Sequence, residues 1–261
     1  MVGDCNQLPP VEYGQPFKDL IKSKYVPVVE LKQLYRCKDM TIICNCQKVI
    51  DGKDDFDDSG SFIRHTANTE GELEDTVVDK FVEIHEPDDP YATQIICPFN
   101  DKTCGVNSLN KKIQKRLNPD SETVSSKNRI FKIGDKVMFT KNRTDYSNGE
   151  LGIITSRTPD RKGMVIRTGH KDIILPVEHY GDITLGYAIT IHKSQGSQFK
   201  NVIIALPESA QASLSRELLY TAFSRTQKDL LIYEQGKVIH DSINRHSDRM
   251  TLLSQKLSKD K

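Results

Sequence analysis

The most regular alternation of apolar and polar residues lies in the stretch Gly186–Phe199. Odd-numbered residues from 187 to 191 are apolar, while Thr190 and His192 alternate with them, which predicts a β-strand with one core-facing side. The opposite side is expected to be free to meet a polar ligand. A lysine, a serine, a glutamine and a glycine then end the alternation. Such a strand-to-turn edge suits phosphate contact, because glycine lets backbone N–H groups approach closely. An ordinary strand and loop is the alternative.

The same analysis along the chain predicts helices that alternate with buried strands, which is typical of an α/β domain around a parallel sheet. In chain order the predicted elements are a short helix from Phe17, a strand over Val26–Leu31, a helix capped by Asp39 and running to Ile50, an acidic helix over Glu70–Ile84, a strand over Tyr91–Phe99, a helix over Cys104–Leu117, a strand over Phe199–Leu206, a helix over Ser213–Ser224, a strand over Asp229–Tyr233 and a surface helix over Lys237–Leu257.

Between residues 129 and 184 the pattern changes to short strands separated by turn-forming residues. The predicted strands are Ile133–Phe139, Glu150–Thr155, Gly163–Arg167 and Asp172–Leu175. Short strands at this spacing predict a small antiparallel barrel inserted within the α/β domain.

Charge is distributed unevenly along the 261 residues, although the formal net charge is only +1. Asp51–Pro90 holds 14 acidic and 3 basic residues, whereas Tyr91–Lys261 holds 27 basic and 17 acidic ones. A basic second half is compatible with nucleic-acid binding, but such imbalance is also common on solvated surfaces. The same two interpretations, with the solvated one slightly favoured, apply to four cations of one predicted helix: Lys111, Lys112, Lys115 and Arg116.

The six cysteines form no Cys-x-x-Cys pair and no zinc-like spacing, so reduced thiols and no metal site are expected. The acidic loop Asp51–Asp58 lacks the oxygen-ligand pattern of a calcium loop. No apolar run is long enough for a signal peptide or a membrane span, so an intracellular, cytoplasmic protein without a membrane partner is expected.

Several segments, taken in order, resemble motifs of superfamily 1 helicases, most closely the RecD-like and Dda-like group with its UvrD-like C-terminal domain. The motif III-like segment is Gly3–Val11, the motif IV-like segment Leu34–Arg36, the barrel-like segments Gly134–Met138 and Asn148–Gly152, the motif V-like segment Gly186–Gly196 and the motif VI-like segment Tyr220–Arg225. The spacing of Asn107 and Asn110, and the triplet Leu117–Pro119, also fit the group.

The resemblance implies two RecA-like domains of the P-loop NTPase type, with ATP and Mg²⁺ between them and single-stranded DNA crossing both. Residues 1–24 would then be a remnant of the first RecA-like domain, 25–128 the first part of the second, 129–184 the inserted barrel, and 185–261 the return of the second domain with a C-terminal helix. DNA repair, recombination and replication are the processes that it suggests.

The sequence contains no Gly-x-x-x-x-Gly-Lys-[Ser/Thr] pattern. That pattern supplies the backbone cradle and the lysine for phosphates. We therefore expect the phosphate-binding loop and the magnesium-binding motif in a missing N-terminal RecA-like domain, which would be a partner of this chain. The chain alone is not expected to hydrolyse ATP efficiently, and it is interpreted as the C-terminal motor portion of a 5′-to-3′ DNA helicase.

The resemblance also implies roles for single residues on the nucleotide side. Arg225 would be an arginine finger on the γ-phosphate, Arg36 a second cation there, and Gln7 a sensor of the same phosphate. The remaining nucleotide contacts would come from Gly196, Gln195 and Gln198, the last standing where many relatives carry a glutamate. The alternatives are that Arg225 caps its helix, that Arg36 is a surface cation, and that Gln7 only braces its loop.

On the nucleic-acid side, the resemblance implies contacts to the strand's backbone from Thr190, His192, Lys193 and Asn100. A structural histidine is the alternative for His192. For the whole chain, the alternatives are a Pif-type helicase, the helicase end of a relaxase, or a non-enzymatic module that grips single strands. DNA and RNA stay open as the bound nucleic acid.

Overall fold

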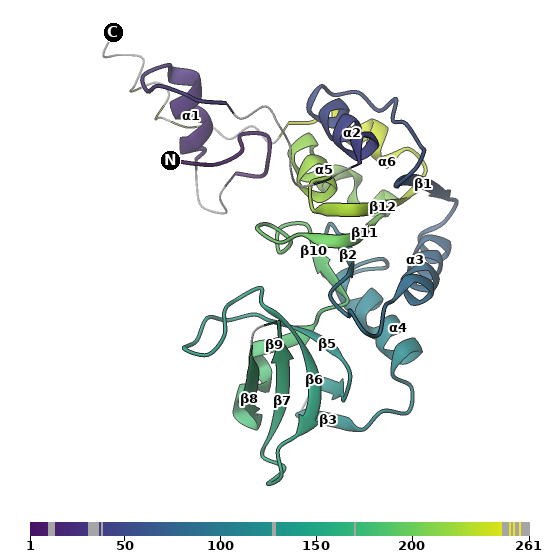
Figure 1. The fold of residues 1–261 in the computed structure, drawn as a ribbon. Helices are drawn as coiled ribbons and strands as arrows, with labels where there is room; N and C mark the ends of the chain where they lie inside the picture. Colours follow the sequence, from purple (N-terminus) through teal and green to yellow (C-terminus); the bar gives the residue numbers. More distant parts are fainter. Residues whose placement is uncertain are drawn as a thin grey trace.

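A five-stranded, wholly parallel sheet forms the centre of the molecule (Figure 1). The structure is a computed structural model and describes residues 1–9, 14–30, 37, 39–126, 129–169, 171–246, 251, 253 and 256. The strand order is β1 (Phe62–Ala67), β12 (Thr226–Gln235), β11 (Phe199–Leu206), β2 (Thr93–Cys97) and β10 (Ala188–Thr190).

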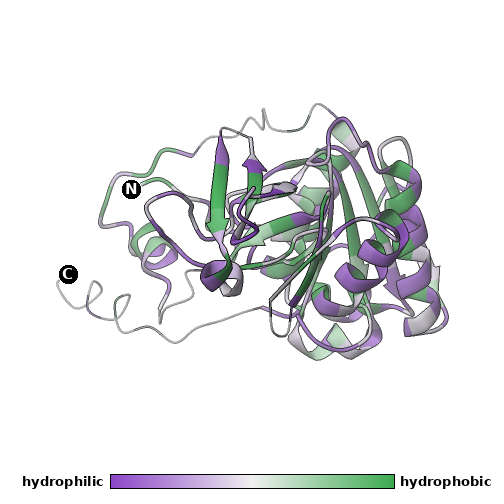
Figure 2. Ribbon diagram, turned by 90° about the horizontal axis from the view of Figure 1, so that it is seen from below, coloured by the Kyte–Doolittle hydropathy of each residue, from purple (hydrophilic) through white to green (hydrophobic). Residues whose placement is uncertain are grey.

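Helices cover both faces of this sheet. One face carries α2 (Met40–Ile50), α5 (Arg216–Phe223) and α6 (Val238–Ile243), and the other carries α3 (Glu70–Ile84) and α4 (Val106–Leu117). Along β11, Val202 and Ile204 pack toward the first group of helices, while Ile203 and Ala205 pack toward the second. Figure 2 shows the strands as mostly hydrophobic between helices with hydrophilic outer sides. Strands buried on both faces explain the nearly continuous apolar run in β11.

An antiparallel region is inserted between α4 and β10 (Figure 1). It consists of the hairpin β3 (Thr123–Ser126) and β4 (Arg129–Lys132), and of a sheet in the order β8 (Asp172–Pro176), β7 (Gly163–Thr168), β6 (Leu151–Arg157), β5 (Lys136–Phe139) and β9 (Ile183–Leu185), with the 3₁₀ helix η1 (Val177–Asp182) before β9. This region, which we call the insert, has its own buried cluster around Phe139, Ile154 and Leu175. Its strands begin at Thr123, six residues before the expected boundary.

The predicted fold class, a parallel α/β domain with an antiparallel insert, is confirmed. The helix predicted over Glu70–Ile84 has these bounds in α3, and the strand predicted over Phe199–Leu206 has them in β11. Asp39 caps α2 as predicted, since its carboxylate accepts a hydrogen bond from the Thr41 N–H at 2.7 Å.

Two predicted elements are wrong or shorter than expected. Residues 26–30 of the predicted strand Val26–Leu31 are not in a strand, and Val29 is 86% exposed, since none of the described strands pairs with them; Leu31 lies outside the described residues. The predicted surface helix over Lys237–Leu257 is interrupted, because α6 ends at Ile243 and residues 244–246 are not helical; after His246 only residues 251, 253 and 256 are described up to Leu257. The 3₁₀ helix η2 (Glu208–Ser213) lies between β11 and α5. Ile239 and Ile243 of α6 are buried against α5 and β12, which makes it a core helix.

The predicted faces of the strand at residues 187–192 also need correction. β10 has only three residues, and Tyr187, which precedes it, packs with α3 and α4 rather than with Ile189 and Ile191. The supposedly free polar side is covered too, because Thr190 is only 9% exposed. Helices on both faces of the sheet leave no open face at this strand.

The first helix, α1 (Pro16–Ser23), stands apart from the sheet beyond α5 (Figure 1). The loop that precedes α1 is connected to α5 by hydrogen bonds, which are described with the candidate site.

Candidate functional site

The register of the parallel sheet separates the predicted site residues into two groups. Thr190 at the end of β10 pairs with Cys97 at the end of β2, so Asn100 and His192 follow at the carboxyl ends of these strands. Phe199 pairs with Thr226 at the starts of β11 and β12, which places Arg225 at the amino ends. The predicted nucleic-acid residues and the predicted arginine finger therefore lie at opposite ends of the strands.

Arg225 is held tightly where α5 ends. The residue is 2% exposed, and its guanidinium donates hydrogen bonds to Thr221 O at 3.0 Å, to Ser197 O at 3.2 Å and to the Ser224 hydroxyl at 2.9 Å. Thr221 O is one of the helix's last carbonyls, which lack a partner within the helix. The arginine thus caps α5 and ties it to the turn over residues 191–198, which we call the β10–β11 turn.

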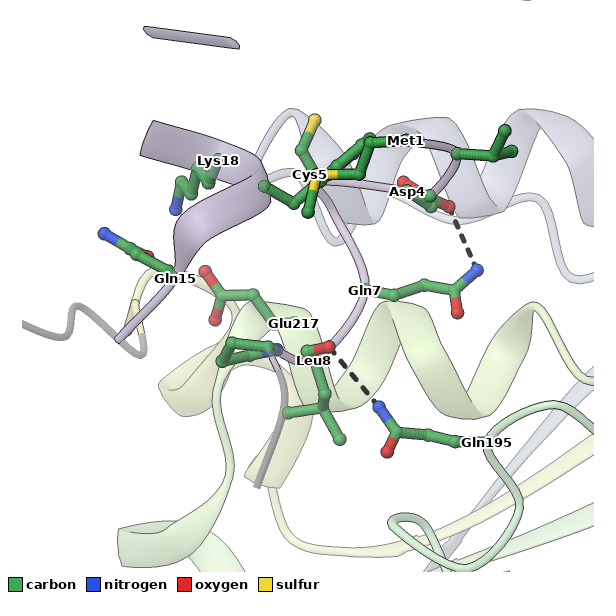
Figure 3. Close-up of a pocket in the computed structure, with 13 residues that line it drawn as sticks. Met1, Asp4, Cys5, Gln7, Leu8, Gln15, Lys18, Gln195 and Glu217 are labelled. Atoms are coloured by element: carbon green, nitrogen blue, oxygen red, sulfur yellow. Dashed lines mark hydrogen bonds between the residues drawn. The ribbon is translucent and has the colours of Figure 1, made fainter. Parts of the chain in front are cut away.

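Three predicted nucleotide-contacting residues lie in the β10–β11 turn. Gly196 is exposed and has φ +83°, a conformation that side chains rarely adopt. The Gln198 side chain accepts a hydrogen bond from the Gln227 amide at 3.2 Å. Gln195 donates to Leu8 O at 3.4 Å, so it contacts the N-terminal loop (Figure 3).

The N-terminal loop, residues 3–9, is bound to α5. The Leu8 N–H donates to the Thr221 hydroxyl at 3.0 Å, and the Tyr220 hydroxyl donates to Asp4 Oδ2, also at 3.0 Å. Gln7 donates its amide N–H to the same carboxylate oxygen at 3.0 Å (Figure 3). Gln7 therefore braces its own loop, which was the structural alternative for this residue.

Three helicase-like segments that are distant in sequence thus meet at one place: the N-terminal loop, the β10–β11 turn and the end of α5. A cavity of about 360 Å³ lies beside them, lined by residues of the first 18 together with Gln195 and Glu217 (Figure 3). Arg36 and the rest of the predicted motif IV-like segment lie outside the described residues.

At the carboxyl end of β10, His192 and Lys193 are exposed. Lys193 Nζ lies 2.7 Å from Asn148 Oδ1, in the loop between β5 and β6 of the insert. The Thr190 side chain does not lie on an open face as predicted. It is buried, and its hydroxyl accepts the Lys193 N–H at 3.3 Å. Its backbone, rather than its side chain, orients the turn through Thr190 O and the Ser194 N–H at 3.0 Å.

Asn100 is exposed at the start of the loop between β2 and α4. The loop is tight: a Cβ on Gly105 would lie 2.7 Å from Asn100 O, and the non-glycine residues Lys102 and Cys104 have φ of +82° and +60°. Such backbone conformations persist only where the surroundings hold them.

Glu74 of α3 holds this loop and was not singled out from the sequence. Its side chain is 4% exposed and accepts the Cys104 N–H at 3.0 Å and Lys112 Nζ at 2.6 Å. Burial raises the pKa of Glu74, but hydrogen bonds from Lys112, Ser108 and Cys104 lower it by more, so the pKa lies below its usual value and the group stays charged. The available signal was an acidic residue in the apolar stripe of α3, four residues before Val78.

Half of the cations on the basic face of α4 are paired with the acidic α3. Lys112 Nζ lies 2.7 Å from Asp75 Oδ1, and Arg116 Nη1 lies 2.8 Å from Asp79 Oδ1. Two of the four cations therefore join the two helices, and Lys111 and Lys115 are exposed.

All six cysteines are unpaired thiols. Within the described part of the chain, no group of three or more His, Cys, Asp or Glu side chains is arranged to hold a metal ion. Nor does that part contain a helix whose length and apolar character would let it span a bilayer.

Family models match three parts of this chain. Residues 185–233 match the UvrD-like helicase C-terminal domain, residues 109–167 the SH3 domain of ATP-dependent RecD-like DNA helicases, and residues 1–68 an AAA domain. The first covers the β10–β11 turn, α5 and most of β12, and the second covers much of the insert.

Curated relatives and solved structures agree with these models. The chain is 30% identical over 238 residues to the ATP-dependent RecD2 DNA helicase of Deinococcus radiodurans, covering 87% of this chain and 31% of that protein. It is 27% identical to a probable conjugal transfer protein TraA of Sinorhizobium fredii, covering 100% of this chain and 24% of that protein.

The fold is similar to that of Pif1 helicases. The Candida albicans structure has a TM-score of 0.56 at 15% identity, covering 99% of this chain and 68% of that one. A Bacteroides structure, in complex with ADP-AlF3 and ssDNA, has a TM-score of 0.51 at 19% identity, covering 97% and 62%.

The matched models and relatives make this chain similar to the C-terminal part of superfamily 1 helicases, and its parallel core with an insert has the fold of Pif1 helicases. Within that superfamily the chain resembles the RecD-like helicases, through the match of residues 109–167 and the identity to RecD2. It spans less than a third of the length of the curated relatives named above.

Proposed function

We propose that this chain is the second motor domain of an ATP-dependent 5′-to-3′ DNA helicase that translocates on single-stranded DNA. The observation that carries the proposal is the meeting of the N-terminal loop, the β10–β11 turn and α5, through Leu8, Gln195 and Thr221. In a two-domain motor, a bound nucleotide must act on segments from both domains, and a connected group of segments can transmit that action.

On the nucleotide side, Arg225, Gly196 and Gln198 would contact ATP from the amino ends of β11 and β12. The Arg225 guanidinium already points its donors at oxygen atoms of Ser197 and Ser224, and a phosphate oxygen could replace the Ser224 hydroxyl. Gln7 and Arg36 would add contacts to the same phosphate, and Gln195 would link the turn to the N-terminal loop.

Mg²⁺ would be held by the first motor domain, because the described residues offer no acidic cluster for it. That domain, with its phosphate-binding loop, would be the partner of this chain. When bound, the Mg²⁺–ATP complex would supply the phosphoryl group whose charge Arg225 neutralises.

On the nucleic-acid side, His192, Lys193 and Asn100 would contact the backbone of the single strand from the carboxyl ends of β10 and β2. Thr190 would act through the shape of the turn that its backbone sets. Contacts to the backbone make binding insensitive to sequence and sensitive to salt.

ATP hydrolysis, with and without single-stranded DNA, tests the motor. It would be measured on this chain and on a version extended upstream, in wild-type, Arg225→Ala and Arg216→Ala forms. Arg216 is a matched control, since it also lies on α5 and donates to the backbone oxygens of Ile243 and Ile50.

We expect turnover only in the extended wild type and the Arg216→Ala form. Hydrolysis by the short chain alone would contradict the proposed division between domains. An equal loss in both arginine variants would mean that Arg225 acts only as a cap of α5.

DNA binding has its own test, in which fluorescence anisotropy of labelled single-stranded DNA is followed against salt. Lys193→Ala should weaken binding and lower the salt slope by about one ion. The control Lys53→Ala removes an exposed lysine of the acidic loop, and it should leave the affinity unchanged.

A second candidate is favoured by the match to TraA over the whole chain: the helicase end of a conjugal transfer relaxase. The upstream sequence separates the two, because a nickase domain would point to the relaxase. A binding module without motor activity is the outcome if the extended protein binds single strands and never hydrolyses ATP.

A further inference from the structure

Buried side chains of three elements hold the short segment through which the chain leaves the insert and enters β10. This segment is Leu185–Ala188. Asn110 of α4, which is 3% exposed, binds both of its ends. The Asn110 amide donates to Leu185 O at 3.1 Å and to Ala188 O at 3.0 Å, and its carbonyl accepts the Ala188 N–H at 2.8 Å.

The middle of the segment is bound by Gln94 of β2. This side chain is fully buried and donates to Gly186 O at 3.1 Å and to Tyr187 O at 2.8 Å. Gly186 also donates to Lys136 O at 2.7 Å. A Cβ on Gly186 would lie 2.9 Å from the carbonyl carbon of Val137, so the segment runs directly against β5.

The third contact is made by Asp135, the residue before β5. Its buried carboxylate accepts the Tyr187 hydroxyl at 3.0 Å, the Asn118 amide at 2.8 Å and the Gln114 amide at 2.5 Å. One carboxylate thus joins the start of the insert's sheet, the end of α4 and the strand that leaves the insert.

We propose that Asn110, Gln94 and Asp135 are positioning residues that make the insert and β10 one rigid body. Apolar packing is non-directional, whereas buried hydrogen bonds to particular carbonyl and N–H groups fix one arrangement. Sliding or rotation of the insert would leave several buried polar groups without partners, which is costly.

The functional consequence lies five residues beyond Ala188. Lys193 meets Asn148 of the β5–β6 loop at 2.7 Å, so this loop faces the β10–β11 turn. The positioning residues therefore fix the β5–β6 loop and the β10–β11 turn in one relative position. This part of the inference rests on the proposed function, in which Lys193 contacts single-stranded DNA.

The structure contains a matched control for Asn110. Asn45 of α2 is also fully buried and holds a backbone group in the same way, by donating to Asp57 O at 2.9 Å and accepting the Asp57 N–H at 3.0 Å. Asn45 lies within the parallel domain, and its hydrogen bonds to Asp57 stay within that domain. Asn110→Ala and Asn45→Ala therefore remove equivalent clamps at different places.

Pulsed electron paramagnetic resonance on the full chain measures the effect. Spin labels are attached to the exposed native Cys44 of α2 and to an Ile174→Cys substitution on β8, where Ile174 is 70% exposed, with Cys5→Ser to avoid a third label. We expect Asn110→Ala to widen the distance distribution by about twofold, and Asn45→Ala to leave it unchanged, although both lower the unfolding temperature. Equal widths in both variants would overturn the proposal.

A double-mutant cycle on single-stranded DNA affinity tests the functional part. Lys193→Ala should weaken binding several-fold in the wild-type background and clearly less in the Asn110→Ala background, because the loop and the turn are no longer aligned. Full additivity contradicts the functional part. If the wild type does not bind single strands, the proposed function fails, and the spin-label distances still decide whether the junction is rigid.

Discussion

The Thr221 hydroxyl accepts the Leu8 N–H at 3.0 Å and so connects residues that are 213 positions apart in the chain. Thr221 is fully buried in α5, one turn before Arg225, which donates to the carbonyl of the same residue. One threonine therefore contacts the N-terminal loop with its side chain and the predicted arginine finger with its backbone. Thr221 therefore links the position of Leu8 directly to that of Arg225.

Thr221→Val removes the acceptor and keeps the shape of the side chain. We expect the unfolding free energy to fall by about 1 kcal/mol, because the Leu8 N–H loses its partner. Hydrogen exchange measured by mass spectrometry should become faster in residues 4–9. The control Thr76→Val removes an exposed hydroxyl that bonds only to its own helix, and it should leave that segment unchanged. Unchanged exchange in Thr221→Val would show that this hydrogen bond does not hold the loop.

Gly105→Ala tests the tight loop that carries Asn100. The added Cβ would lie 2.7 Å from both Asn100 O and Asp101 O, so the loop must move, and we expect a loss of about 2 kcal/mol in unfolding free energy. Urea unfolding measures the loss. Gly71→Ala in α3 is the control, because nothing lies near its Cβ, and it should be neutral or slightly stabilising. If the two variants unfold alike, the loop is not constrained as described.

Lys136 makes stability depend on pH. Burial lowers its pKa to about 7, and Nζ donates to Thr93 O at 3.0 Å. The unfolded lysine keeps its proton up to about pH 10.4, so between these values the unfolded state binds more protons and native stability rises with pH. Lys136→Met should remove this rise, of at most about 1.4 kcal/mol per pH unit, in urea unfolding. The exposed control Lys53→Met should keep the rise of stability with pH. If the rise persists in Lys136→Met, groups other than Lys136 cause it.

Asp182 of the insert also makes stability rise with pH, but in the acid range. Burial raises its pKa, but Lys141, Arg143 and Tyr146, with donor atoms at 2.6, 2.7 and 2.9 Å, hold that pKa well below its usual range. A lowered carboxyl pKa contributes stability that is present above the unfolded value of about 3.9 and is lost as the pH falls below it.

Asp182→Asn should therefore destabilise the chain at neutral pH and flatten its acid unfolding, as followed by circular dichroism from pH 6 downward. Asp172→Asn is the control, because its partner Arg167 and the carboxylate itself are about half exposed. Such pairs contribute little. If both variants unfold alike in acid, the contacts of Asp182 do not determine the acid stability of the chain.

Elements whose pattern depends on their own residues were predicted well from the sequence. The apolar stripe of α3 and the buried run of β11 require no knowledge of neighbours, and their bounds agree with the structure. The apolar run from Val26 was predicted as a strand, but residues 26–30 are not in one. A strand needs a partner strand, and the sequence does not reveal whether one is present. Tyr187 fails because strand alternation was extended across residues that precede β10.

The candidate site was predicted in part. The sequence indicated the segments around Gln7, Gln195 and Arg225, and the structure brings them together. Contacts between distant residues, such as Lys193 with Asn148 and Glu74 with Cys104, depend on tertiary packing and leave no local pattern. Thr190 was expected on an open face, since the sequence does not show that helices cover both sides of the sheet.

The insert departs after Leu117 and returns at Leu185–Ala188, and its two ends are neighbours: the Asn118 amide lies 3.3 Å from the Tyr187 hydroxyl. The parallel domain therefore closes on itself without the intervening residues. Because the entropy of closing a loop grows slowly with its length, the outer loops of the insert can be shortened or lengthened at small cost in chain entropy. A change in these outer loops can therefore alter the surface that the insert presents beside the β10–β11 turn, while the buried contacts at the junction and the parallel sheet keep their architecture.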